Sequence, residues 1–164
     1  MPRSKPKTAK EFVEELERDP VYMERRAVQD AALANRAAEA EADEASLVRD
    51  LADAGVLVTS VYDLVNDVIT TPHAVPVLLG HLGRPHLPVI REGILRALAY
   101  SHLRQGALSS LKDLFSGATE PGERWLIANA MAAMATLKEL SELAGINEYA
   151  GLFKHTPGKQ RRKR

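Results

Sequence analysis

The residues that could do chemistry are few, and their spacing matches no catalytic or metal-binding motif. His73, His81 and His86 gather in one stretch, but their spacings of eight and five residues do not form the i,i+4 helical pair of a zinc site. We therefore expect these histidines to lie on the surface or in turns. Asp63 and Asp67 do have i,i+4 spacing, yet such carboxylate pairs are common on solvated helix faces.

Other catalytic signatures are missing from the sequence. There is no cysteine, which excludes disulfides, thiolate metal ligands and thiol catalysis. No nucleophile stands beside a base, and there is neither a glycine-rich phosphate loop nor an HExxH helix. We expect a protein that is not an enzyme and that holds no metal or other cofactor.

Charge divides the chain into an acidic body and two basic ends. The 22 Lys and Arg residues balance the 22 Asp and Glu residues overall, but residues 1–10 hold four cations and residues 154–164 hold six. We expect residues 1–8 and 154–164 to be disordered. The final segment could contact phosphates of a nucleic acid, weakly and without sequence specificity, through Lys159, Arg161, Arg162, Lys163 and Arg164. A tail that only keeps the protein soluble is the alternative.

The elements that would position any site are helices, because Ala and Leu abound and only 5% of the residues are aromatic. Residues 9–54 predict a short helix opened by a Thr8–Glu11 capping box, then an acidic, Ala-rich helix of about 35 residues that begins at Pro20. This long helix could pack across the remaining helices or mediate self-association. Further helices are expected over Val61–Val68, 74–82, 88–103, 107–115, 121–134 and 137–144.

The helices after residue 73 contain a repeat of 33 residues. HLGRPHLPVIREGILRAL (81–98) and LFSGATEPGERWLIANAM (114–131) align without a gap. The matched pairs are Leu78 with Leu111, Leu82 with Phe115, Pro88 with Pro121, Arg91 with Arg124, and Ile94 with Ile127. Each unit is a helix, a turn with Gly or Pro, and a second helix, which must stack on a neighbour to bury its apolar face.

The stretch AVPVLLGHLGRPHLPVIREGILRALA resembles a HEAT repeat, with Pro and Leu-Leu in the first helix and a second helix that opens with Pro, then Val and Arg, and runs into Ala-Leu-Ala. The resemblance covers roughly residues 47–145, with Leu47 and Leu51 beginning a loose first copy, and the chain is similar to small bacterial HEAT-repeat proteins. It implies an all-α fold: a short right-handed α-solenoid of two to three helix pairs over residues 47–153, preceded by the long helix. Some DNA glycosylases share this architecture, but their basic, aromatic cleft does not fit a chain with an acidic body and one Trp.

The resemblance also implies that partners bind the concave side, which the second helices line. The candidate partner-binding residues there are Arg91, Glu92, Arg96, Arg124, Trp125 and Asn129. Arg91 and Arg124 could instead form ion pairs between repeats, one of them with Glu120, and Trp125 could be buried under the C-terminal helix. We expect a non-catalytic module that binds a protein partner.

The sequence also gives expectations about location. No window approaches the roughly 18 apolar residues of a membrane span, and no apolar run follows the basic start as it would in a secretory signal. We expect a cytoplasmic protein with no membrane contact.

Overall fold

The structure is a computed structural model that describes residues 8–66 and 71–155. These residues form helices and turns, with no strand among them, so the predicted all-α class is confirmed. Most of the two basic ends that we expected to be disordered lies outside the described residues. No helix in the described ranges is both long and apolar enough to cross a membrane. Contacts divide the chain into two units, Met1–Ala40 and Glu41–Arg164.

The first unit holds α1 (Ala9–Arg18) and the greater part of α2 (Pro20–Asp53). The Thr8–Glu11 capping box is present: the Glu11 amide donates to Thr8 Oγ1 at 3.3 Å, and the Thr8 amide donates to Glu11 Oε2 at 2.8 Å. Asp19 caps α2 in the same way, accepting from the Val21 amide at 2.9 Å. No residue from 8 to 40 is buried, so this unit is held by helix propensity and local hydrogen bonds.

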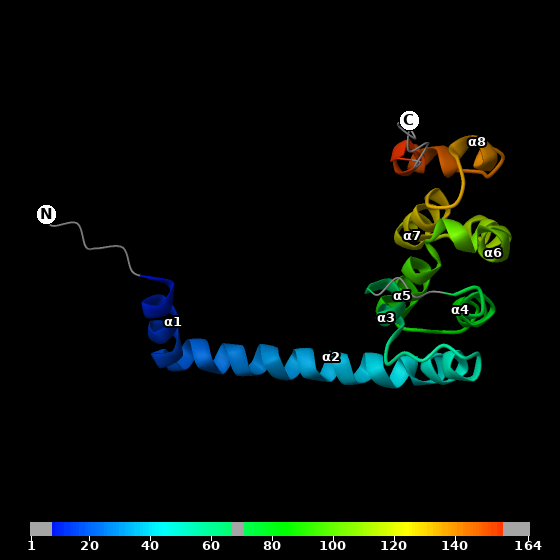
Figure 1. Ribbon diagram of the computed structural model, residues 1–164. Coiled ribbons are helices and arrows are strands. Elements are labelled where there is room, and N and C mark those ends of the chain that lie inside the picture. Colours follow the sequence, from blue (N-terminus) through cyan, green and yellow to red (C-terminus); the bar gives the residue numbers. More distant parts are fainter. Residues whose placement is uncertain (1–7, 67–70, 156–164) are drawn as a thin grey trace, which may run out of the picture. The chain divides into compact units, whose positions relative to one another are not determined.

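The second unit begins within α2, whose Leu47 and Leu51 are fully buried. The helices that follow are α3 (Val61–Asn66), α4 (Ala74–Leu82), α5 (Pro88–Leu98), the 3-10 turn η1 (Ser101–Leu103), α6 (Arg104–Gly117), α7 (Pro121–Ala132), α8 (Leu137–Leu140) and η2 (Ile146–His155). Helix α4 contacts α5 and α6, while α7 contacts α5 and α6. In Figure 1, α4 and α6 therefore form one layer, and α5 and α7 form the other.

The repeated apolar positions fill the space between these layers. Leu78 and Leu111 are fully buried, as are Ile94 and Phe115. Each matched pair has the same burial because the two helix pairs present the same face to the core. The 33-residue period is thus a period of packing.

Several helices end at other residues than the sequence predicts. Helix α5 stops at Leu98 and not at Leu103, because the backbone at Ala99 leaves the helical region and Tyr100 becomes extended. The Tyr100 hydroxyl then donates to the Val65 carbonyl at 3.0 Å, which holds this break in place. Helix α7 ends two residues early, at Ala132. Helix α8 contains only four of the eight residues that the sequence predicts to be helical.

Helices α3 and α5 approach each other closely at Gly93. A Cβ atom at this position would lie 2.6 Å from Val61 Cγ1 and 3.2 Å from the Tyr62 ring. The Val61 side chain is fully buried and, being β-branched, has little freedom to move away. Glycine in the middle of α5 is therefore required by packing, although it costs helix propensity.

We predict that Gly93→Ala lowers the free energy of unfolding by about 1–3 kcal/mol, because the strain of overpacking exceeds the gain in helix propensity. The matched control is Gly80→Ala in α4, where an added Cβ meets no atom within 4 Å. This control should raise stability by up to about 1 kcal/mol. Urea unfolding of both variants measures the difference, and equal effects would contradict the close α3–α5 contact.

Candidate functional site

The two repeated arginines bind backbone carbonyls at the ends of the helices that precede them. Arg91 Nη1 donates to the carbonyl of Leu82, the last residue of α4, at 2.8 Å. At the equivalent place, Arg124 Nη1 donates to the carbonyl of Phe115 at 3.2 Å, and its guanidinium lies 4.2 Å from the centre of the Phe115 ring. Both contacts satisfy carbonyls that have no partner within their own helix.

Each arginine also reaches the next element of the chain. Arg91 forms an ion pair with Glu123 in α7, and Arg124 Nη2 donates to the Ala144 carbonyl at 3.0 Å. The expectation that Glu120 supplies the carboxylate is wrong, because Glu123, one turn further along, faces Arg91. Arg91 and Arg124 therefore hold the stack together, Arg91 through an ion pair and a carbonyl and Arg124 through carbonyls.

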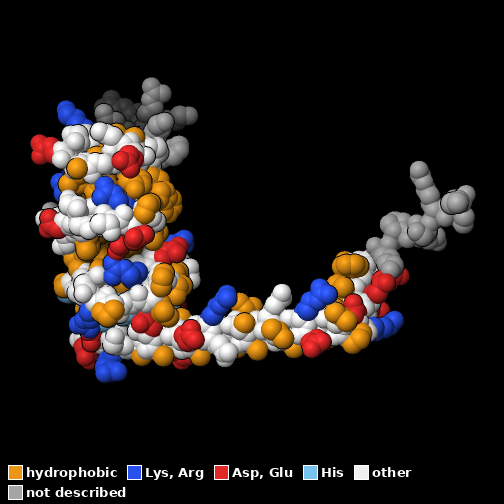
Figure 2. Space-filling model, turned by 180° about the vertical axis from the view of Figure 1, so that it is seen from behind, with side chains coloured by type: hydrophobic (Ala, Val, Ile, Leu, Met, Phe, Trp, Pro, Cys, Tyr) orange, Lys and Arg blue, Asp and Glu red, His pale blue; other side chains and the backbone are white. Residues whose placement is uncertain are grey.

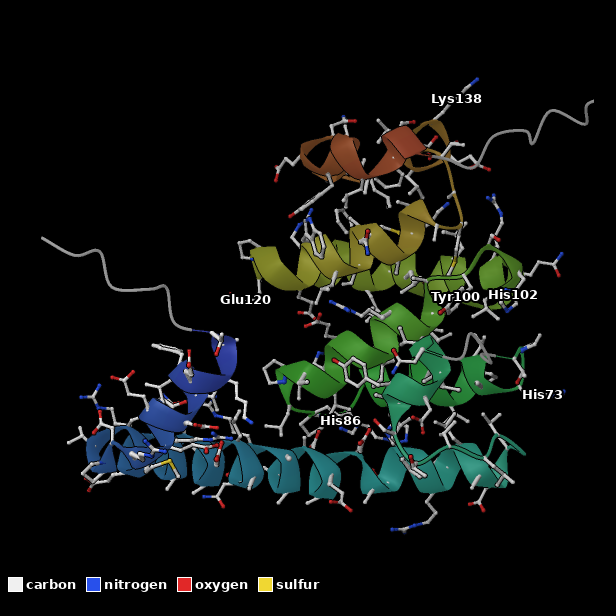
Figure 3. The ribbon with its side chains drawn as sticks, turned by 60° about the vertical axis from the view of Figure 1, so that its left-hand side comes forward. His73, His86, Tyr100, His102, Glu120 and Lys138 are labelled. Carbon is white, nitrogen blue, oxygen red and sulfur yellow. The ribbon has the colours of Figure 1, made fainter. Side chains whose placement is uncertain are left out.

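A groove lies between the N-terminal halves of α5 and α7. Its volume is about 390 Å³, and Pro88, Leu95 and Leu126 give it an apolar floor and wall. Three carboxylates line the same groove: Glu92, Glu120 and Glu123. Glu92 is paired with Arg96 one turn along α5 and Glu123 is paired with Arg91, whereas Glu120 forms no ion pair within residues 8–66 and 71–155. Glu120 is the residue directly before α7 and lies at the end of this helix (Figure 3).

The candidate partner-binding residues line two different hollows or lie beside them. Arg91 and Glu92 line the groove, with Arg96 beside Glu92. Trp125 is 46% exposed on α7 and is not buried under the C-terminal helix. Asn129 lines a different hollow of about 450 Å³, together with Tyr100, Ser101 and Leu152.

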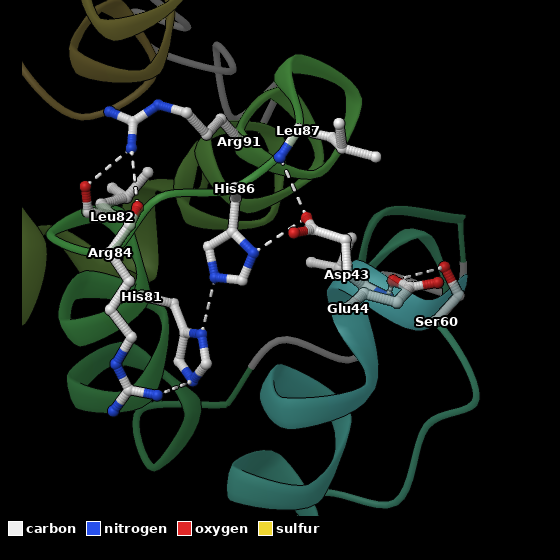
Figure 4. A network of polar contacts seen from close by, with 10 residues as sticks. Asp43, Glu44, Ser60, His81, Leu82, Arg84, His86, Leu87 and Arg91 are labelled. Carbon is white, nitrogen blue, oxygen red and sulfur yellow. Dashed lines mark hydrogen bonds and ion pairs between the residues drawn. The ribbon is translucent and has the colours of Figure 1, made fainter. Parts of the chain in front are cut away.

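A buried polar network that the sequence did not predict lies where α2 meets α4 and the start of α5 (Figure 4). The side chains of His81 and His86 are only 1% and 3% exposed. His86 lies in the turn between α4 and α5, as expected, but the expectation is wrong for His81, which is buried within α4. Their rings contact each other, with His81 Nδ1 2.9 Å from His86 Nε2. His86 Nδ1 lies 3.0 Å from Asp43 Oδ2, and His81 Nε2 lies 2.9 Å from Asp50 Oδ2.

Backbone and side-chain donors complete this network. Asp43 also accepts from the Leu87 amide at 3.0 Å, directly before α5 begins. Hydrogen bonds from His81 and from Arg84 lower the pKa of the Asp50 carboxyl. Nearby, the buried Glu44 accepts from the Val61 amide at 3.0 Å and so caps α3. In sequence, the only signal was the seven-residue spacing of Asp43 and Asp50, which places both on one face of α2.

The described residues add no candidate to the metal-binding or nucleic-acid-binding residues considered from the sequence. In residues 8–66 and 71–155, no group of three or more His, Asp or Glu side chains could hold a metal ion. The nucleic-acid candidates Lys159, Arg161, Arg162, Lys163 and Arg164 lie outside the described residues.

Comparison with protein-family models, with curated proteins and with solved structures gives no match to the chain. The groove and the exposed helix faces are therefore the features that bear on function.

We predict that Gly145→Ala destabilises the protein by about 2–3 kcal/mol. Gly145 has a φ of 80°, and an added Cβ would lie 2.6 Å from Arg124 Nη2, which would push the arginine off the Ala144 carbonyl. The control is Gly55→Ala, which has a φ of 81° and open space around the Cβ position. Thermal unfolding should show a loss of only about 1 kcal/mol for the control. Equal losses would mean that the backbone conformation alone accounts for the effect.

Proposed function

We propose that the chain is a non-catalytic protein-interaction module, built from HEAT-like helix pairs in a short right-handed α-solenoid. The pairs are α4 with α5 and α6 with α7. The first helices of the two pairs, α4 and α6, contact each other, and so do the second helices, α5 and α7. The recurrence of the arginine contact supports this assignment, since Arg91 and Arg124 each reach a carbonyl nine residues earlier in the chain.

The groove between α5 and α7 is the observation that carries the proposal. It lies between the two second helices, and its apolar floor is about large enough for one or two side chains of a partner. Because three carboxylates line it and one of them, Glu120, is not paired with a cation in the described part of the chain, the complementary ligand is a protein segment with an apolar anchor flanked by Lys or Arg. The exposed Trp125 on α7 adds a side chain of the type that often dominates binding energy.

This partner chemistry can be tested by selecting binders for the full-length protein from a displayed library of random peptides. We expect the selected peptides to combine an apolar residue with nearby Lys or Arg. Glu120→Lys should weaken their binding about three- to tenfold. Gly122→Leu should abolish it, because Gly122 lines the groove and an added Cβ meets no atom of the protein within 4 Å, so that the Leu side chain would occupy the groove.

The control for this experiment is Glu142→Lys, an equal charge reversal at an exposed residue outside the groove. The control should bind the selected peptides like the wild type. Peptides that bind all three variants equally would contradict the groove as the binding site. The nucleic-acid alternative has no supporting contact in the described part of the chain.

A second observation favours self-association through the first unit. Val28 and Leu33 on α2 are 65% and 60% exposed, and Figure 2 shows hydrophobic side chains interspersed with charged ones along this helix. Arg25, Val28, Ala32 and Glu39 recur at helical spacing and so share a face of α2. A second copy in antiparallel orientation would place each Arg25 opposite the other chain's Glu39. We therefore propose a second copy of this chain as the occupant of that face.

Charge reversal tests this pairing by sedimentation analysis. Arg25→Glu and Glu39→Arg should each weaken the dimer, because like charges then face each other across the interface. The double variant should restore the dimer by exchanging the two partners. A wild-type protein that stays monomeric at high concentration, or a double variant no better than either single one, would contradict the proposal.

A further inference from the structure

The groove between α5 and α7 has a lining that suits long basic side chains. It combines an apolar floor with three carboxylates and one guanidinium, that of Arg91, so its lining holds two more carboxylates than cations. Lys and Arg place their methylene stems on apolar surface and their charged heads beside carboxylates. The groove therefore fits a basic segment even when that segment has no large apolar residue.

Residues 156–164 of the same chain are a segment of this kind. Their sequence, TPGKQRRKR, contains five cations and no carboxylate side chain, and the segment lies outside the described residues. The cations are Lys159, Arg161, Arg162, Lys163 and Arg164. Each arginine can take one groove carboxylate through two parallel hydrogen bonds. Charge complementarity therefore makes residues 156–164 an occupant that fits the groove.

The segment is also long enough to reach the groove. It follows η2, whose Leu152 lines a hollow together with Ala132 and Ala133 at the C-terminal end of α7. The groove lies along the first half of the same helix, which has 12 residues and is therefore about 18 Å long. Nine extended residues span about 30 Å. A segment that begins near the end of α7 can thus follow this helix and bring its last cations to the groove.

We propose that residues 156–164 bind in the groove between α5 and α7 of the same chain and compete there with the protein partner. The competition rests on the proposed function of the groove, whereas the internal contact does not. The segment supplies cations for the carboxylates but has no large apolar side chain for the floor. A partner with an apolar anchor makes a contact that the segment lacks, and so displaces it.

The short connection to η2 decides how strongly the segment competes. Exposed ion pairs are weak individually, but a short tether gives an effective concentration in the millimolar range. The segment therefore occupies the groove in a fraction of the molecules, and the apparent affinity of the partner falls to the fraction of grooves that are free. Because the contact depends on exposed charges, it should weaken as salt is added.

Paramagnetic NMR tests the internal contact without any partner. The chain has no cysteine, so Gln160→Cys gives the full-length protein one site for a nitroxide label without removing a cation. We expect the label to broaden the amide signal of Gly122, which lines the groove, more than that of Ala133 at the C-terminal end of α7. The broadening at Gly122 should disappear in about 1 M salt, where the Debye length is about 3 Å.

Two charge reversals in the labelled protein locate the contact. Glu120→Lys should remove the broadening at Gly122, because it replaces a groove carboxylate with a cation. Glu142→Lys, an equal change at an exposed residue outside the groove, should keep it. Broadening that is strongest at Ala133 or Glu148, or that both variants retain at Gly122, would overturn the proposal.

Exchange of all five cations of residues 156–164 for Gln tests the competition in the full-length protein. The peptides selected from the displayed library should bind this variant about two- to tenfold more tightly than the wild type. The control exchanges Arg3, Lys5, Lys7 and Lys10 for Gln, which removes a similar charge near the other end of the sequence. This control should bind the peptides like the wild type. An equal gain in both variants, or no gain in either, would overturn the competition.

The two proposals about the groove fail in different ways. Broadening at Gly122 in a protein for which no peptide is selected would support the internal contact and contradict the proposed partner. Peptides that bind in the groove of a protein whose Gly122 signal is not broadened would support the partner and overturn the internal contact.

Discussion

The bond from an arginine of one helix to a carbonyl in the last turn of its neighbour is the interaction on which the stack depends. The carbonyls at a helix C-terminus have no partner inside the helix, and burial without one is costly. Arg91 and Arg124 satisfy these carbonyls at Leu82 and Phe115. Because the same guanidinium also reaches the following element, one side chain fixes both the angle within a helix pair and the contact between pairs.

The same turn that Arg91 closes also brings together the buried network and the groove. Its carbonyl contact ends at Leu82, next to His81 of the buried network, while Pro88 and Arg91 line the groove. Asp43 holds the start of α5 through the Leu87 amide. The buried network and the groove therefore share the start of α5.

Helix starts were more predictable than helix ends. Capping boxes and prolines act within four residues, so Thr8, Pro88, Pro121 and Thr136 open helices where the sequence indicates. The end of α5 depends on a distant contact, since Tyr100 leaves the helix to donate to the Val65 carbonyl. The burial of Leu78, Leu111, Ile94 and Ile127 was predictable because these residues recur with the repeat. The close contact at Gly93 was not predictable, because it depends on residues of another helix.

The sequence by itself determined the helical class, the 33-residue packing period and the residues that fill the core, because propensity and periodicity are local properties of the chain. Only the tertiary structure decided what the polar residues do. It brought His81 and His86 between two carboxylates of α2, 31 and 43 residues away in the chain, and it directed Arg91 and Arg124 to carbonyls. Polar side chains find their partners by position in space, and residue spacing along the chain does not contain that information.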